Sequence, residues 1–306
     1  MIGSHLIRYF ERRLPGPIRA IVRSLSPADG SRLRDVETTY GDLCSLHDCA
    51  VFASGLQTII YLAHTNSPIT SDADLPSDAA LNMIPLLTLL QAIKDSRSRP
   101  HLIYFSSGGA VYGANPGRVA FRECDSCQPM SSYGIQKLAA EHYLRFAAFR
   151  GILTATVLRV GNAYGTLLPN QRLQGLIGVA VNNLLHGRPL RVFGDPSNVR
   201  DYVHLDDVAR MCEIVMSPRE PFAVYNVGCG IGHSVREVVH IVAECFGAEL
   251  PDETPSILEG AGGLPEWVVL DISKAKRELD WTPGIDLRTG VSRLIQETRV
   301  TPRVEQ

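Results

Sequence analysis

Short apolar runs rich in β-branched residues alternate, over the first half of the chain, with longer segments whose apolar residues recur at helical spacing. Four of the short runs predict β-strands, at 17–22, 57–63, 101–107 and 154–160. The helical spacing predicts helices at 81–94 and 134–149, and then near 174–185 and 234–246. Strands and helices that alternate in this way predict a doubly wound α/β fold, in which helices cover both faces of a parallel sheet.

The pattern loosens after residue 166, where glycine, proline and asparagine become more frequent. We therefore expect residues 1–166 to form the main α/β domain and residues 167–306 to form mainly a smaller, less regular C-terminal lobe. Strand segments within 203–227 are expected to return to the main sheet. Ligands of open parallel sheets bind beyond the carboxyl ends of the strands, so the segments to inspect follow residues 22, 63, 107 and 160.

Composition limits the classes of function. The 306 residues are 45% hydrophobic and 20% charged, with a formal net charge of −2, as in an ordinary globular protein. A charge so close to zero gives no reason to expect nucleic acid or an anionic membrane as a partner. No apolar run approaches the roughly 20 residues that span a bilayer, and Arg8 and Glu11 distinguish the first helix from a signal peptide. We expect a cytoplasmic protein.

Seven cysteines are scattered along the chain, and Cys124 and Cys127 form a C-x-x-C pair. A structural zinc site would need a second pair of ligands at similar spacing, which the sequence lacks. The pair also lies in a predicted loop, whereas a redox pair usually opens a helix. We expect free thiols and no metal site.

Tyr133 and Lys137 carry the strongest chemical signal. Residues four apart on a helix share one face, so the spacing places the lysine ammonium beside the phenol. A neighbouring cation favours the phenolate and is expected to lower the tyrosine pKa from about 10. Tyr133 would then serve as an acid or base near neutral pH. A surface Tyr–Lys pair on an amphipathic helix is the alternative interpretation of the same spacing.

Six segments resemble, in their order and spacing, the extended short-chain dehydrogenase/reductases, and among them the NAD-dependent nucleotide-sugar epimerase/dehydratase family that includes UDP-glucose 4-epimerase. They read YFSSGGAVYG (104–113), SSYGIQK (131–137), LRVGNAYG (158–165), VFGDPSNVRDYVHLDDVA (192–209), YNVGCG (225–230) and LDISKAKRELDWTP (270–283). The resemblance implies a Rossmann domain that binds NAD or NADP and a smaller lobe that binds a nucleotide sugar.

The resemblance also implies roles for individual residues. Tyr133 matches the catalytic tyrosine, which removes a proton from a sugar hydroxyl while hydride moves to the nicotinamide, and Lys137 matches the lysine that holds the nicotinamide ribose. The implied dinucleotide contacts are Ile2, Gly3, Arg23, Asp42, Leu43, Ala63, Tyr133 and Lys137. The implied contacts to the nucleotide sugar are Ser107, Gly108, Asn162, Phe193 and Arg200. Relatives often dimerise through the helices that match 81–94 and 134–149, so we expect a homodimer.

The N-terminal pattern of the family is incomplete in this sequence. Relatives place a strand and a G-x-x-G-x-x-G turn before the first helix, and Gly3 matches the last of these glycines. The glycines let the backbone approach the cofactor pyrophosphate, and the strand is the middle one of the sheet, so its neighbours would have unpaired edges. We expect a start codon assigned too late or a truncated chain, with a natural protein about ten residues longer. A degenerate relative that binds no cofactor is the alternative.

Two further departures concern single positions. An acid after the second strand usually contacts the ribose 2′-hydroxyl of NAD; Val22 and Arg23 stand there, and Arg23 favours NADP unless it is simply solvated. Gly108 stands where the family commonly has the serine or threonine that binds the reacting sugar oxygen. Ser107 is the remaining candidate, although on a regular strand it would face the other side unless the glycines kink the backbone.

The same segment discriminates among the reactions of the family. Dehydratases carry an acid pair where Gly109 and Ala110 stand, while decarboxylating relatives and deoxysugar epimerase-reductases need a glutamate or a cysteine at the second position. The simplest remaining reaction is a 4-epimerisation: oxidation at C4, rotation of the keto sugar and return of hydride to its other face. An NADPH-dependent 4-ketoreductase and a catalytically weakened nucleotide-sugar-binding relative are the alternatives. The sequence does not predict the sugar.

Overall fold

The main sheet is parallel, and its strands lie where the apolar runs predict them. In the computed structural model, β4 (His101–Ser107) lies between β3 (Thr58–Tyr61) and β5 (Thr154–Val160), and β9 (Phe222–Val227) pairs with the other side of β5. Nearly every side chain of β4 and β5 is buried, which explains why their sequences are continuously apolar rather than alternating. The strand predicted to return within 203–227 is β9.

The structure describes residues 2–14, 16–23, 36–68, 70–167, 175–193, 195–248, 256–258 and 265–300. Among these residues, no helix is both long and apolar enough to cross a membrane.

A second parallel pair, β1 (Arg19–Val22) and β2 (Glu37–Tyr40), forms a sheet of its own. Within the described ranges, neither strand shares a ladder with β3. Side chains make the connection instead: Arg19 donates hydrogen bonds of 3.1 Å to the carbonyl oxygens of Phe52 and Ser54, at the end of α3 (Leu46–Ala53). The β2 strand was not predicted, because its four residues, two exposed and two half-buried, give no clear apolar run.

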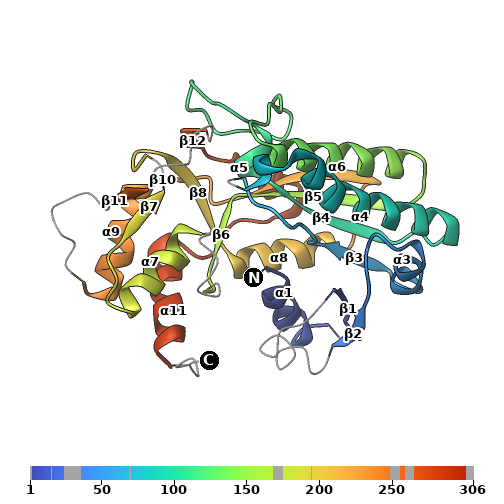
Figure 1. The fold of residues 1–306 in the computed structure, drawn as a ribbon, viewed down its shortest axis with the longest axis horizontal. Coiled ribbons are helices and arrows are strands. Elements are labelled where there is room, and N and C mark those ends of the chain that lie inside the picture. Colours follow the sequence, from blue (N-terminus) through green and yellow to red (C-terminus); the bar gives the residue numbers. More distant parts are fainter. Residues whose placement is uncertain are drawn as a thin grey trace.

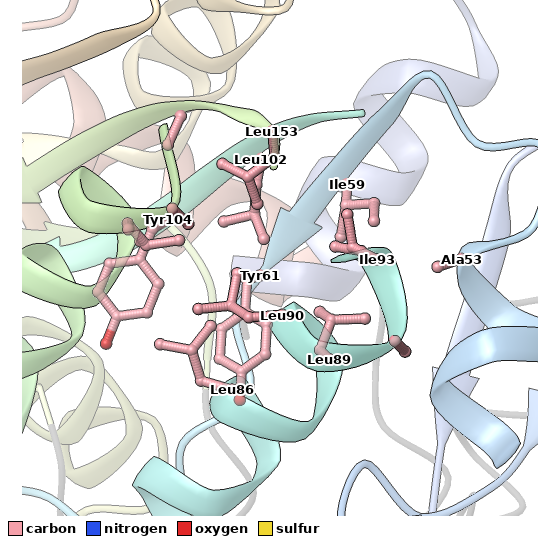
Figure 2. Close-up of a cluster of buried hydrophobic side chains, with 14 of the residues drawn as sticks. Ala53, Ile59, Tyr61, Leu86, Leu89, Leu90, Ile93, Leu102, Tyr104 and Leu153 are labelled. Carbon is pink, nitrogen blue, oxygen red and sulfur yellow. The ribbon is translucent and has the colours of Figure 1, made fainter. Parts of the chain in front are cut away.

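Helices cover both faces of the four-stranded sheet (Figure 1). On one face lie α3, α4 (Leu75–Ser96) and α6 (Ser132–Phe149), and on the other lie α1 (Ile2–Glu11) and α8 (Leu205–Val215). Figure 2 shows how Leu86 and Leu89 of α4 and Leu102 of β4 gather with Tyr61 and Tyr104 in the buried cluster between helix and sheet. This is the helix–sheet–helix arrangement that the alternating pattern predicts.

The C-terminal lobe has its own apolar cluster, which includes Val181, Val242 and Val291. Its helices are α7 (Leu176–Leu185), α9 (Val235–Phe246) and α11 (Leu287–Val300). The central strand β8 (Val199–His204) pairs with β6 (Asn162–Tyr164), β10 (Gly232–Ser234) and β12 (Trp267–Val268), and β7 (Arg191–Phe193) pairs with β11 (Ser256–Leu258). The remaining short elements are η1 (Ser71–Ala73), α5 (Gly108–Val111) and α10 (Ser273–Leu279).

Candidate active site at the carboxyl edge of the sheet

Tyr133 lies in the first turn of α6, against the short helix that follows β4. The α6 helix begins at the N-cap residue Ser131, whose side chain accepts a hydrogen bond from the backbone N–H of Gly134. A Cβ atom on Gly134 would lie 2.5 Å from the carbonyl oxygen of Ala110 in α5. Glycine at this position therefore allows the turn that carries Tyr133 to reach the carboxyl edge of the sheet.

Ser107 acts on the pKa of Tyr133, although on a regular strand its side chain would face the other side. It is the last residue of β4 and the N-cap residue of α5, so the backbone turns directly after it, at Gly108. Burial raises the pKa of Tyr133 to about 12, while a hydrogen bond with Ser107 acts in the opposite direction. The prediction of a lowered tyrosine pKa is wrong for this structure, because burial outweighs the favourable contact.

Lys137 is buried and hydrogen-bonded to the sheet rather than to the tyrosine. Its Nζ atom donates to the carbonyl oxygen of Phe105 at 2.8 Å and lies 5.5 Å from the centroid of the Tyr133 ring. Burial lowers the pKa of Lys137 to about 7, and the carboxylate of Glu141 opposes that shift. The alternative of an exposed surface Tyr–Lys pair is therefore excluded, because Lys137 is buried and Tyr133 is half-buried.

The two glycines after Ser107 have different surroundings. A Cβ on Gly109 would lie 3.6 Å from Asn162 Oδ1 and 3.8 Å from Ser107 Oγ, so these two polar side chains meet beside that residue. A Cβ on Gly108 would lie only 2.6 Å from Cδ1 of the buried Leu270. Position 108 therefore has no room for a side chain, and the structure brings Ser107 and Asn162 together beside Gly109.

A buried ion pair, which the sequence analysis missed, lies one helical turn beyond Lys137. The Arg159 guanidinium of β5 donates three hydrogen bonds of 2.7 to 3.2 Å to the Glu141 carboxylate of α6. Ser106 of β4 donates a 2.5 Å hydrogen bond to the same carboxylate, and Arg159 also donates to the hydroxyl of Tyr112. The helix that carries Tyr133 is thus fixed to two neighbouring strands. In the sequence, this ion pair is indicated only by one charged residue within each of two otherwise apolar patterns, at 134–149 and 154–160.

His64 is a second residue of the site that the sequence analysis did not select, although it begins the segment after residue 63. Its ring packs edge-on against the Tyr133 ring, with centroids 4.7 Å apart and an interplanar angle of 87°. Burial first, and then the charge of Lys137, lowers the pKa of His64 to about 3, against the opposing effect of Asp78. The imidazole is therefore neutral at physiological pH.

The residues predicted to contact the dinucleotide fall into two groups. Ile2 and Gly3 begin α1, where a Cβ on Gly3 would lie 3.4 Å from Leu62, next to the exposed Ala63 after β3. Arg23 follows β1, and Asp42 follows β2, where its carboxylate accepts a hydrogen bond from the backbone of Cys44.

Ala63, Arg23 and Asp42 follow the carboxyl ends of parallel strands, where dinucleotides bind, and Gly3 lies beside Leu62 at one of these ends. Burial raises the pKa of the Cys44 thiol, the charge of Asp42 raises it further, and the charge of Arg23 opposes both effects. Leu43 is half-buried and packs against the core rather than standing free.

The structure does not bring the remaining two sugar-nucleotide candidates into the Tyr133 cluster. Arg200 lies in β8, and its guanidinium donates to the carbonyl oxygens of Val199 and Glu266. Phe193 lies in β7, where its backbone pairs with that of Leu258, and its side chain is outside the described atoms.

Comparison with known proteins assigns the family. Residues 1–228 match the NAD dependent epimerase/dehydratase family. The chain belongs to this family. The dTDP-4-dehydro-6-deoxyglucose reductase of Escherichia coli is 28% identical over 262 residues, which cover 83% of this chain and 78% of the reductase.

Solved structures extend the similarity to both lobes. The UDP-glucose 4-epimerase of Thermotoga maritima, solved with UDP-glucose, has a TM-score of 0.89 and 28% identity, with 98% of this chain and 96% of that chain covered. The UDP-glucose 4-epimerase of Thermus thermophilus, solved as a complex with NAD, has a TM-score of 0.84 and 27% identity, with the same coverage. The Rossmann-like fold predicted from the sequence is thereby confirmed.

Proposed function

We propose that the protein is a nucleotide-sugar 4-epimerase in which Tyr133 is the acid/base. The supporting observation is that a half-buried tyrosine, whose pKa Ser107 acts to lower and which lies one helical turn from a buried lysine, stands at the carboxyl edge of the sheet in a member of this family. Similarity to two UDP-glucose 4-epimerase structures favours a UDP-sugar as the substrate.

The chain's own residues would move the proton. A bound oxidised nicotinamide would accept a hydride from C4 of the sugar and return it. Tyr133, in its phenolate form, would take the proton of the C4 hydroxyl and give it back after the keto sugar has rotated. Ser107 would donate to the phenolate oxygen, and Asn162 would bind a hydroxyl or phosphate oxygen beside it, because both side chains meet next to Gly109. Lys137, when charged, would stabilise the phenolate.

The residues described fit a dinucleotide. Gly3 lies in the first turn of α1, and Arg23 and Asp42 stand at the carboxyl ends of β1 and β2. Arg23 is exposed, and a cation at this position favours NADP over NAD. That preference and the similarity to the Escherichia coli reductase also support a second candidate, an NADPH-dependent 4-ketoreductase.

A homodimer is part of the proposal. Large apolar side chains stand exposed on the outer faces of α4 and α6, namely Leu81, Ile84, Ile135, Tyr143, Phe146 and Phe149. Exposed apolar patches of this kind mark protein–protein contacts.

Cofactor analysis and an epimerase assay test the proposal together. The purified protein is denatured, released NAD(H) and NADP(H) are quantified by mass spectrometry, and conversion of UDP-glucose to UDP-galactose is followed. Tyr133→Phe should lower kcat about 10²- to 10⁴-fold, the usual contribution of an acid/base, while its cofactor content stays at the wild-type level.

The matched control is Tyr143→Phe, which loses an exposed hydroxyl from the same helix and should keep full activity. Wild-type activity in Tyr133→Phe would refute the assigned role. Reduction of a 4-keto sugar with oxidation of NADPH, in the absence of epimerisation, would favour the 4-ketoreductase.

A further inference from the structure

His64 carries a buried polar atom for which the described protein offers no partner. Its Nε2 atom is shielded from solvent and lacks a hydrogen-bond partner among the described residues. Buried polar atoms are normally paired, and each exception requires an explanation. The same condition applies to Tyr61 Oη, His101 Nε2 and Gln136 Oε1, so position in the fold must decide which exception concerns a ligand.

Position separates His64 from Tyr61 and His101, and Gln136 differs because its amide nitrogen already donates to Asp78 and Ser132. His64 follows β3 by three residues and so lies at the carboxyl edge, whereas His101 begins β4 at the opposite edge and Tyr61 belongs to the core cluster beneath α4. At the carboxyl edge the His64 ring contacts the ring of Tyr133 directly, 4.7 Å between centroids. The unpaired nitrogen therefore belongs to a residue of the reaction site.

The surroundings of His64 also fix its chemical form. Lys137 is the cation that acts on it, and Asp78 is the carboxylate that acts on it. Asp78 is already engaged by neutral donors from Asn66, Asn82, Ser132 and Gln136. The imidazole stays neutral, and a neutral imidazole offers one donor and one acceptor. Such a group suits a sugar hydroxyl, which both donates and accepts.

We propose that His64 is a ligand-contacting residue of the Tyr133 site, whose Nε2 atom exchanges a hydrogen bond with a hydroxyl group of the bound dinucleotide ribose or of the hexose. The inference rests on the proposed function, because it takes the ligands from there. It adds a residue that the Tyr133–Lys137 spacing does not indicate. The edge-on contact has a second effect, because the His64 ring limits the positions that the Tyr133 ring can take.

Two substitutions separate hydrogen bonding from packing. His64→Phe keeps an aromatic ring against Tyr133 and removes the nitrogen, whereas His64→Gln keeps a donor and an acceptor at the reach of Nε2. Tyr61→Phe is the matched control, because it removes a buried and equally unpaired polar atom from the core. The melting temperature of each variant is measured first; His64→Phe and Tyr61→Phe should be at least as stable as the wild type, because each loses an unpaired buried polar atom.

Binding is then measured by NAD(H) fluorescence titration and by UDP-glucose calorimetry. His64→Phe should raise the Kd of one ligand roughly 2- to 10-fold, the value of one hydrogen bond, with His64→Gln nearer the wild type and Tyr61→Phe unchanged. Weaker dinucleotide binding identifies the ribose as the source of the hydroxyl, and weaker UDP-glucose binding identifies the hexose.

Wild-type affinity of His64→Phe for both ligands would overturn the inference and leave the proposed function standing. A wild-type protein that binds neither ligand would overturn both.

Discussion

Lys137 is a cationic side chain held out of water, so its charge should make stability depend on pH. Its pKa falls from 10.5 to about 7 on folding, chiefly through burial. Between these values the unfolded chain binds a proton that the folded protein does not, so this group makes stability rise with pH. Below pH about 7, Lys137 is charged in both states, and burial of that charge lowers the free energy of unfolding by its full amount.

Lys137→Met should therefore stabilise the protein most at neutral pH. Its advantage over the wild type should shrink as pH rises, by at most about 1.4 kcal/mol per pH unit. Urea denaturation of both proteins at several pH values between neutral and pH about 10 measures the difference. A difference that stays constant over this interval would show that Lys137 keeps its charge when buried.

The two adjacent glycines of α5 make a second test at the residue scale. Gly108→Ala should destabilise the protein by about 1 to 3 kcal/mol, the usual cost of overpacking, because its Cβ would stand 2.6 Å from a buried Leu270 methyl carbon. Gly109→Ala is the matched control, since its nearest neighbour is 3.6 Å away, and alanine favours a helix. The melting temperatures of the two variants are compared by thermal unfolding. Equal values would mean that the Leu270 side chain moves aside at no cost in stability.

At the scale of elements, the Glu141–Arg159 pair holds α6 to β5. Glu141→Gln leaves a buried guanidinium without its carboxylate and should cost about 3 to 5 kcal/mol. The exposed pair Arg288–Glu244, with 2.6 Å between its charged atoms against 2.7 Å for the buried pair, is the control; Glu244→Gln should cost less than about 1 kcal/mol.

A double-mutant cycle tests whether the loss comes from the pair itself. Glu141→Gln combined with Arg159→Gln should recover part of the stability, because no unpaired charge remains in the interior. Additive losses in denaturation experiments would show that each side chain is needed for other contacts, such as those to Ser106 and Tyr112.

Elements with long apolar runs could be predicted from the sequence, and the site only in part. The strands at 101–107 and 154–160 are found at the predicted residues, because burial on both faces leaves continuous apolar sequence. The effect of Ser107 on the pKa of Tyr133 depends on a turn at Gly108, which alternation along a strand cannot reveal. The raised pKa of Tyr133 depends on burial by distant segments, and His64 lies in a loop without a periodic pattern.

At the scale of the whole molecule, the exposed apolar face of α4 and α6 should bring two copies of the chain together. Phe146 and Phe149 of α6 are 56% and 87% exposed, and Ile84 of α4 is 48% exposed. We expect a dimer by light scattering after gel filtration, and a monomer when Ile84 and Phe146 are both changed to Glu.

Ile231 supplies the control for the dimer. It is 59% exposed and lies between β9 and β10, away from this face. Ile231→Glu should remain dimeric. A wild-type protein that is monomeric at micromolar concentration would refute the proposed interface.

The division of the sheet determines what an unfolding experiment on this protein reports. Backbone ladders connect β3, β4, β5 and β9 into one cooperative body, whereas β1 and β2 are joined to it through side chains such as Arg19. The free energy needed to open the small sheet can therefore differ from that of the large one. The large sheet is contacted by Lys137, Gly108 and Glu141, so a spectroscopic signal from that sheet measures their contribution to stability. The small sheet, which would carry the adenosine end of a dinucleotide, can loosen without changing that signal.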